Sequence, residues 1–421
     1  MKQENANIIS AIPVIIIQFL SGFSESAVRS IIIIFIAFSV IDIAGLPQAP
    51  LVNIVNVFAI VPTLFLSSYS GKFADKYNKV LILRSLTWYQ IAMALIVALC
   101  IYKQLMIPLL LVLLAIGFQQ TVLCSVRFSI LTEYFTTTKQ ISIATGCIEF
   151  AWFAASLTGQ IFGSFTITSH KMFLFAIVIL INSLICVGAG FILKPITKSS
   201  HISLPTKFYL NPFKDFWYMF KQVGQIPSIF LNMNATGWFW AFCSINTTQM
   251  SLFAANYLGV DGHIFGIILG IGTFGIGIGS ILCAKLSRGV IQRKVVVISA
   301  IAASLATIVM LLLHPDIYLA KNTCRQFIFS VPGAILFSLI LIKAIALGAY
   351  SLTCYTEAQV LAHNNNRSQV MSIISVVSAI YITIASGVCT LLQVTVSSWT
   401  ILFITAIINI GLAIVYYYRI K

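Results

Sequence analysis

The stretch Gly71-Lys72-Phe73-Ala74-Asp75-Lys76-Tyr77-Asn78-Lys79 decides the fold class of this chain. A long apolar run precedes it and another follows it, and the stretch itself holds one carboxylate, three lysines and one glycine. A tight, charged connection between two apolar helices is typical of a polytopic membrane protein whose basic loops face the cytoplasm. Two roles remain open for it: it sets the topology alone, or it also takes part in the working of the protein.

Composition places the chain among membrane proteins. Of its 421 residues, 59% are hydrophobic and 8% are charged, whereas about 25% of the residues in a soluble domain are charged. The formal net charge of +15 does not predict a nucleic-acid partner, because most Lys and Arg residues lie in short loops. There they set orientation and face anionic headgroups, so the lipid bilayer is the first predicted partner.

Twelve apolar runs are long enough to cross a bilayer, which takes about 20 residues of helix. The longest polar interval, residues 194–224, separates six of these runs from the other six. We expect an all-α membrane protein of twelve transmembrane helices in two six-helix halves: residues 1–193, a cytoplasmic linker at 194–227, and residues 228–421. The predicted helices are approximately 11–39, 51–70, 79–101, 106–131, 141–166, 172–193, 228–256, 264–285, 294–313, 329–354, 368–392 and 397–418.

The loops carry unequal charge, which orients the chain. With the N-terminus inside, the outer loops hold only Lys103, Lys171, Lys321 and Arg325. The cytoplasmic loops hold Lys72, Lys76, Lys79, Lys139, Lys194, Lys198, Lys207, Lys214, Lys221, Lys285, Arg288, Arg293, Lys294, Arg367, Arg419 and Lys421. This asymmetry predicts both termini in the cytoplasm. Residues 212–223 of the linker are aromatic and basic, and form either an amphipathic helix in the membrane interface or a plain linker.

Ionisable residues at membrane depth are costly and are therefore functional candidates. In the helix predicted at 11–39, Glu25 and Arg29 are four residues apart and share a face. Either they form a self-neutralised pair that packs the helix against a neighbour, or Glu25 lines a substrate cavity and binds a cation or a proton. Lys343 is a further embedded cation, expected to be paired or to face the cavity.

Arg127, in the helix predicted at 106–131, keeps its proton and therefore needs an anion. Its candidate partners are Glu149, Glu25, and the phosphate or carboxylate of a substrate; alternatively, its charge extends to the membrane interface. Glu149 belongs to a polar stripe that faces the cavity or another helix, formed by Thr145, Glu149, Trp152, Ser156 and Gln160. In the same helix, the G-x-x-x-G motif from Gly159 to Gly163 permits close packing.

The sequence holds no convincing catalytic or cofactor-binding motif. Its nine cysteines form no C-x-x-C, and no Cys/His cluster has the spacing of metal ligands. The phosphate-binding pattern G-x-x-x-x-G-K-[ST] is absent. The run from Gly270 to Gly275 matches G-x-G-x-x-G only as text, because it lies within an apolar helix. We expect a protein that is not an enzyme and that uses no metal and no cofactor.

The opening stretch, followed by Arg84, resembles the signature G-x-x-x-D-[RK]-x-x-[RK] between helices 2 and 3 of the major facilitator superfamily. A weaker copy without the carboxylate follows the eighth predicted helix, as Ala284-Lys285-Leu286-Ser287-Arg288. The resemblance implies a secondary transporter of two six-helix halves. It also implies a gating role, outside the substrate cavity, for Gly71, Asp75, Lys76 and Lys79. Asp75 would lie beside a helix N-terminus or a neighbouring Arg or Lys.

A narrower resemblance covers three predicted helices. The runs are Phe19-Leu20-Ser21-Gly22-Phe23-Ser24-Glu25-Ser26-Ala27, Cys124-Ser125-Val126-Arg127-Phe128-Ser129-Ile130-Leu131 and Ile143-Ala144-Thr145-Gly146-Cys147-Ile148-Glu149. They resemble F-L-x-x-[FL]-x-D-N-A, G-P-[VI]-K-Y-[GS]-I-L and V-[GA]-x-N-[GA]-L-[VI]-E of bacterial lysophospholipid transporters. Charge sign is kept at positions 25, 127 and 149, but Glu25 stands for Asp, Arg127 for Lys, and Cys124-Ser125 for Gly-Pro.

This narrower resemblance implies a lysophospholipid flippase of the bacterial inner membrane. Arg127 would meet the phosphate, and Glu25 or Glu149 would meet an amine or a coupling cation. No acyltransferase follows in this chain, so a re-acylating enzyme would be a separate partner. Two alternatives remain open: a proton-coupled exporter of drugs or small metabolites, which would carry another amphiphilic small molecule, and a membrane scaffold that transports nothing.

Overall fold

The computed structural model of the chain describes residues 8–38, 48–103, 105–168, 171–195, 211–253, 262–287, 289–313, 330–362, 366–393 and 395–420. Some of the charged residues that orient the predicted loops lie outside these ranges, namely Lys198, Lys207, Arg288, Lys321, Arg325 and Lys421.

Within the described ranges, twelve helices have 19 residues or more, and each coincides with one predicted span. By length and composition, 10 helices can cross a membrane, and the other two long helices, α2 and α9, match the runs predicted at 51–70 and 228–256. The predicted all-α membrane fold is confirmed. The long helices are α1 (Ile12–Phe38), α2 (Gln48–Lys76), α3 (Lys79–Tyr102), α4 (Met106–Ser129), α6 (Thr138–Thr168), α7 (Met172–Ile192), α9 (Pro227–Phe253), α10 (Gly262–Leu286), α11 (Lys294–Leu312), α13 (Val331–Leu361), α14 (Arg367–Leu392) and α15 (Ser398–Ile420).

Most of the opening stretch is helical, so the expectation of a loop over residues 71–79 was wrong. Helix α2 continues through Gly71 to Lys76, and only Tyr77 and Asn78 separate it from α3. Lys76 lies in the last turn of α2, where a cation is favourable beside the free carbonyl groups. The side chain of Asn78 then accepts hydrogen bonds from two backbone amides in the first turn of α3 and so starts that helix.

The described chain divides into two compact units. Unit 1 comprises Met1–Thr136, Ala151–Ile226 and Gln359–Val376, and unit 2 comprises Thr137–Phe150, Pro227–Ala358 and Val377–Lys421. Helix α6 therefore contributes its first part to unit 2 and its remainder to unit 1. Helix α14 contributes its first turns to unit 1 and its remainder to unit 2.

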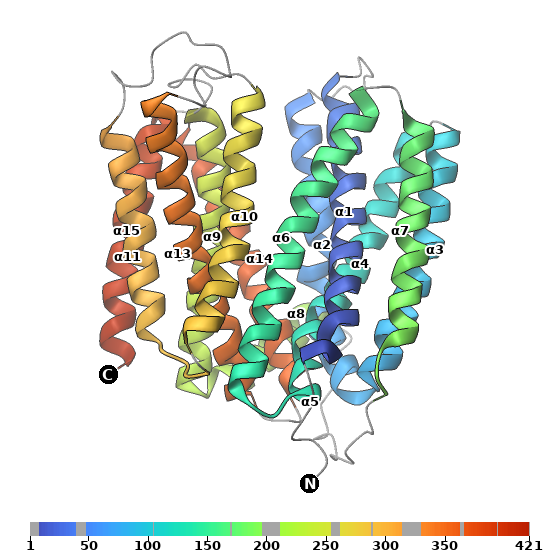
Figure 1. Cartoon of the computed structure of the whole chain (residues 1–421), viewed down its shortest axis with the longest axis horizontal. Helices are drawn as coiled ribbons and strands as arrows, with labels where there is room; N and C mark the ends of the chain where they lie inside the picture. The colour runs from blue at the N-terminus through green and yellow to red at the C-terminus, as the bar shows by residue number, and fades with distance from the viewer. Residues whose placement is uncertain are drawn as a thin grey trace. The chain divides into compact units, whose positions relative to one another are not determined.

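Unit 1 is a bundle of long helices (Figure 1) in which α3 packs against α4 and α7, α1 packs against α4 and α7, and α2 packs against α4. Its buried apolar core includes Ile31 of α1, Val97 of α3, Leu113 of α4 and Phe175 of α7. Some polar side chains of the same helices, among them Gln90 of α3 and Asn182 of α7, are also buried in this bundle.

The G-x-x-x-G motif of α6 allows close packing, as its sequence predicted, and the structure shows that the partner helix is α1. A Cβ atom at Gly159 would stand 2.5 Å from the carbonyl oxygen of Phe23, and one at Gly163 would stand 2.5 Å from that of Ala27. Only residues without a side chain permit this approach of the two backbones.

Unit 2 is a second bundle, in which α15 packs against α9 and α11. Its apolar core includes Phe239 of α9, Val297 of α11, Leu347 of α13 and Ala413 of α15. Helix α10 approaches α13 closely, because Gly279 leaves room for the backbone of that helix.

Shorter elements complete the described chain: η1 (Ile8–Ala11), α5 (Leu131–Tyr134) and α8 (Pro212–Gly224). Helix α8 occupies the aromatic and basic segment of the linker, which is therefore helical. It packs against α2 within unit 1.

Candidate functional site

The carboxylate of Asp75 caps the N-terminus of α14. Its Oδ1 accepts a hydrogen bond from the amide of Ser368 at 3.0 Å, and its Oδ2 accepts one from the amide of Gln369 at 3.1 Å. These amides belong to the first turn of α14, where N–H groups have no partner within their own helix. Two surroundings were predicted for Asp75, a helix N-terminus or a neighbouring Arg or Lys. The structure places its carboxylate at a helix N-terminus. Asp75 lies outside the membrane-spanning segments; burial raises the pKa of its carboxyl, and the bonds from Ser368 and the charge of Lys79 oppose that rise.

The residue just before α14 does not cap its own helix. Asn366 stands where an Asn side chain commonly accepts a bond from the first turn. Its Oδ1 is buried and has no hydrogen-bond partner. The two amides that such a cap commonly uses are those bonded to Asp75.

Gly71 and a set of serines bring α2 against the same turns of α14. A Cβ atom at Gly71 would stand 2.7 Å from the Cβ of Ser372 and 2.9 Å from the Cα of Gln369. Ser67 Oγ donates to the carbonyl oxygen of Ser372 at 3.0 Å. The glycine of the signature is therefore a packing requirement.

The lysines of the opening stretch differ in their surroundings. Lys79 is buried and forms an ion pair with Glu133 of α5. Lys76 is exposed, with its ammonium 5.5 Å from the ring centroid of Tyr77. Lys72, to which the sequence assigned only topology, forms a fully buried ion pair with Asp215 of α8 at 2.5 Å. The gating role predicted for Gly71, Asp75, Lys76 and Lys79 stays a prediction.

Glu25 and Arg29 lie together on α1, as their spacing predicted. The nearest Arg29 nitrogen is 3.7 Å from a carboxylate oxygen of Glu25, and their side chains are 27% and 15% exposed, respectively. This distance exceeds that of a hydrogen bond. The pair is therefore loose.

Arg127 is a buried cation without an ion-pair partner in the part of the chain that the structure describes. Its exposure is 9%, and its Nε has no hydrogen-bond acceptor. Its guanidinium carbon lies 4.7 Å from the ring centroid of Phe128. The structure does not pair Arg127 with Glu25, whose ion-pair partner is Arg29.

Glu149 lies in unit 2, where two hydroxyl groups hold it. Its Oε2 accepts hydrogen bonds from Ser280 Oγ of α10 at 2.8 Å and from Ser351 Oγ of α13 at 3.0 Å. The residue is 5% exposed.

Lys343 is a second buried cation that forms no ion pair with any described residue. Its Nζ donates to Asn246 Oδ1 of α9 at 3.2 Å, and its exposure is 8%. One turn further along α9, the amide group of Gln249 is fully buried, and neither of its polar atoms has a hydrogen-bond partner. Lys343 was expected to be paired or to face the cavity; within the described residues its partner is the neutral Asn246, and its place in the cavity stays a prediction.

The sequence analysis missed a buried polar network in unit 1. Gln90 Oε1 of α3 accepts hydrogen bonds from Ser21 Oγ at 2.6 Å and from Gln119 Nε2 at 3.2 Å. Asn182 Nδ2 of α7 donates to Ser24 Oγ at 2.7 Å. The sequence does carry a signal for this network, because Gln90 and Asn182 are amide side chains within apolar runs.

A second missed cluster holds Glu357 in unit 2. The carboxylate accepts a hydrogen bond from Arg293 Nε at 2.5 Å and one from Asn232 Nδ2 at 3.1 Å. Helix α13 extends past its predicted end at 354, so Glu357 lies inside the helix. Glu357 therefore has a structural partner.

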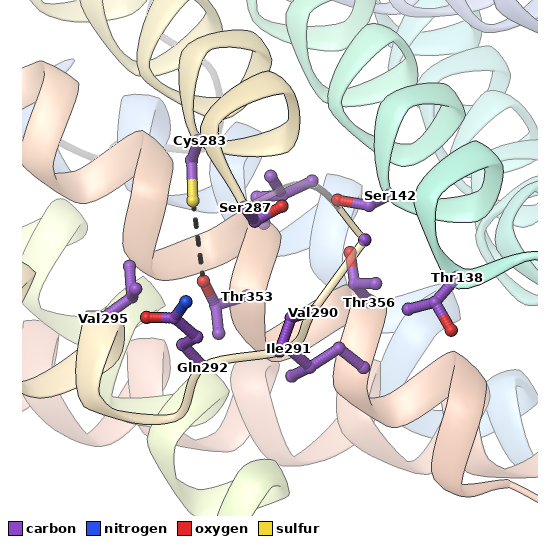
Figure 2. A pocket seen from close by; sticks show the side chains of 12 residues that line it. Thr138, Ser142, Cys283, Ser287, Val290, Ile291, Gln292, Val295, Thr353 and Thr356 are labelled. Carbon is purple, nitrogen blue, oxygen red and sulfur yellow. Dashed lines mark hydrogen bonds between the residues drawn. The ribbon is translucent and has the colours of Figure 1, made fainter.

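A small pocket lies in unit 2 and is shown in Figure 2. Its side chains are uncharged, and hydroxyl groups dominate the polar ones. None of the predicted site residues lines it. The lining residues are Thr138, Ser142, Cys283, Ser287, Gly289, Val290, Ile291, Gln292, Val295, Leu352, Thr353 and Thr356.

Long apolar helices with isolated charges buried between them define a multi-pass membrane transport protein. The sequence profile of the Major Facilitator Superfamily matches residues 14–386, and the chain belongs to this family. It is a secondary transporter and not an enzyme.

Solved structures share the fold. The transporter FucP in the outward conformation is 12% identical, with 99% of each chain covered and a TM-score of 0.70. A second structure of FucP, the fucose:proton symporter of E. coli, is 11% identical, with 99% of each chain covered and a TM-score of 0.70. A bacterial homologue of the iron transporter ferroportin, outward-facing with soaked iron, is 12% identical; 97% of this chain and 99% of that chain are covered, with a TM-score of 0.67. No curated protein matches the sequence.

Proposed function

We propose that this transporter flips lysophospholipid across the bacterial inner membrane by alternating access, and that Arg127 binds the phosphate of the lipid. The observation that carries the proposal is the buried guanidinium of Arg127, which forms no ion pair with a described residue. The three runs that resemble lysophospholipid transporters, one of which contains Arg127, support the choice of substrate.

A buried charge without a counter-ion is unfavourable. Arg127 cannot escape this cost by losing its proton, so an anion that enters from outside the protein relieves it. A phosphate group suits a guanidinium well, because it accepts two parallel hydrogen bonds. The Nε of Arg127, which lacks an acceptor, is one donor that such a phosphate would occupy.

Glu25 supplies the partner for a headgroup amine in this proposal. Its contact with Arg29 is longer than a hydrogen bond, so a substrate ammonium can share the carboxylate without displacing a tight ion pair. Glu149 and Lys343, both buried in unit 2, are the groups proposed to bind or sense a coupling ion.

Gating in this proposal belongs to Gly71, Asp75, Lys76 and Lys79. The two halves, residues 1–193 and 228–421, move against each other so that the cavity opens to one side of the membrane at a time. The linker at 194–227 connects them. Both termini lie in the cytoplasm, and a separate acyltransferase uses the lipid that is delivered there.

Reconstitution tests the proposal. The purified protein would be placed in liposomes with a fluorescent lysophosphatidylethanolamine, and its flipping would be followed by reduction of the dye from outside. We expect Arg127→Ala to weaken substrate affinity about tenfold to a hundredfold, because it removes a charge-assisted interaction of about 1.5–3 kcal/mol. Arg127→Lys should retain part of the activity, since Lys still binds phosphate as a point charge.

The matched control is Lys103→Gln, which removes an exposed cation at the C-terminus of α3. It should flip lipid as the wild type does. If the wild type flips the lipid only at the background rate, lysophospholipid is not the substrate. Full flipping by a correctly folded Arg127→Ala variant would refute the site instead.

A proton-coupled exporter of drugs or small metabolites is the second candidate, and the environment of Glu149 favours it. Glu149 is a carboxylate that is 5% exposed within an apolar helix, and carboxylates buried at membrane depth are typical proton carriers in transporters. In that case an imposed proton gradient drives uptake of a dye substrate, and Glu149→Gln abolishes this response to the gradient. The wild type then does not flip the fluorescent lipid above the background rate.

A further inference from the structure

Helix α8 forms from local signals in its own sequence. The side chain of Asn211 accepts hydrogen bonds from the amides of Phe213 at 3.0 Å and Lys214 at 3.3 Å. Pro212 takes the first helical position, where its missing amide costs nothing. An acidic residue in the first turn and Lys221 in the last complement the helix dipole. The linker thus contains a helix that its own sequence specifies.

The inner face of α8 is fixed to α2. Asp215, Met219 and Val223 recur every four residues and are buried. Asp215 forms its ion pair with Lys72 of α2, and both side chains are fully buried. The ring of Tyr218 lies 5.9 Å from the same ammonium group. Removing one partner of such a pair leaves a buried charge alone, so the helix is held in one orientation.

The outer face of α8 is aromatic and basic. Phe213 and Trp217 are 69% and 55% exposed, and Lys214 and Lys221 are exposed beside them. The ammonium of Lys221 lies 5.6 Å from the ring centroid of Trp217. The sole acidic residue of α8 is the buried Asp215, so the outer face carries positive charge alone.

The contacts of α8 place it at the end of a transmembrane helix. Helix α2 has 29 residues and is therefore about 43 Å long, longer than the hydrocarbon core of about 30 Å. Phe213 contacts Phe65 of α2, with ring centroids 5.5 Å apart, and Lys72 lies near the last residue of α2. Helix α8 therefore runs along the end of α2, where that helix passes from the core to the headgroups.

We propose that the outer face of α8 binds anionic phospholipid headgroups, with the rings of Phe213 and Trp217 at the acyl boundary and Lys214 and Lys221 against the lipid phosphates. Indole and phenyl rings flanked by lysines are typical of helices that lie in the membrane interface. The buried ion pair links α8 to α2, the helix that carries Asp75. Anionic lipid that binds the outer face of α8 would therefore act on α2 through this ion pair. This inference does not depend on which substrate the protein carries.

Brominated lipids test the contact in the full-length protein. The fluorescence of Trp217 is isolated as the difference between the wild type and Trp217→Phe in nanodiscs. Bromines placed near the headgroup should quench this difference signal more than bromines placed deep in the acyl chain. Trp88, an exposed residue within the membrane-spanning helix α3, gives the matched reference through Trp88→Phe. Its signal should respond more to the deeper bromines.

Headgroup selectivity is tested with brominated phosphatidylglycerol against brominated phosphatidylcholine at the same mole fraction. We expect phosphatidylglycerol to be enriched at Trp217 by about fivefold to thirtyfold, because two lysines contribute near an anionic surface. High salt should reduce this enrichment. The variant Lys214→Gln/Lys221→Gln should lose it, whereas Lys103→Gln/Lys171→Gln, which removes two exposed lysines elsewhere in unit 1, should keep it.

Two results would overturn the proposal. If no brominated lipid quenches the Trp217 signal, α8 does not contact the bilayer, and its outer face is a plain linker surface or meets a protein. If both headgroups quench Trp217 equally, α8 touches lipid without recognising its charge. Either result leaves the lysophospholipid proposal unaffected, because that proposal depends on flipping and on Arg127.

Discussion

Replacing Asp75 by Ala should uncap α14 and free its first turn. The variant loses two hydrogen bonds to a charged acceptor, each worth about 1.5–3 kcal/mol before solvent replaces it. Water can reach this half-buried position, so the net loss is closer to that of a helix cap together with its dipole interaction, about 2–3 kcal/mol. At 1.4 kcal/mol per factor of ten, the amides of Ser368 and Gln369 should exchange with solvent about 30- to 150-fold faster.

Asn366 makes this prediction sharper. Its Oδ1 has no hydrogen-bond partner while Asp75 occupies the N-terminus of α14, so Asn366→Ala alone should leave exchange unchanged. In Asp75→Ala, Asn366 can turn and cap the helix itself. The double variant should therefore exchange about fivefold faster than Asp75→Ala, since a cap is worth about 1 kcal/mol.

Hydrogen–deuterium exchange with mass spectrometry of peptides that cover residues 366–376 measures these rates at a fixed pH. Lys76→Gln is the matched control, because it removes an exposed charge adjacent to Asp75. The capping argument fails if Asp75→Ala changes the exchange of this peptide less than twofold. It also fails if Asn366→Ala alone has as large an effect as Asp75→Ala.

Asp215→Leu should lower the melting temperature of the purified protein, because Lys72 remains buried without its partner at a cost of about 3–5 kcal/mol. The variant Lys72→Met/Asp215→Leu should recover most of the loss in the same fluorescence melt. No recovery would show that the pair does not act as a unit. Gly159→Ala should destabilise unit 1 by about 1–3 kcal/mol, because its Cβ would meet a backbone carbonyl of α1. Gly188→Ala, where no atom lies within 4 Å of the added Cβ, should melt as the wild type does.

Two side chains, those of Asp75 and Asn366, are placed where they can cap the N-terminus of α14. In the structure Asp75 caps α14, and Asn366 has an idle acceptor. If Asp75 withdraws during transport, the amides of α14 need not face water, because Asn366 stands beside them. An exchange between two caps lowers the free-energy cost of separating α2 from α14.

The lengths of the apolar runs were sufficient to predict the twelve long helices, because a bilayer requires about 20 apolar residues for each crossing. Spacing alone predicted the pairing of Glu25 with Arg29 and the close packing at Gly159. These are properties of one helix or of one helix face, and 3.6 residues per turn determine them.

Contacts between residues distant in the chain could not be read in this way. The sequence around Lys72 indicates only a topology signal, because its partner Asp215 lies on α8, 143 residues later in the chain. The unused acceptor of Asn366 is explained only by the structure, in which Asp75 of α2 binds the amides that Asn366 would cap. The same holds for Gln90 and Asn182, whose partners come from other helices. The sequence by itself determined which segments are helices and which charges are costly. Only the tertiary structure decided which partner offsets each cost, because a buried polar group is stabilised by whatever the packing of the helices brings within hydrogen-bond distance.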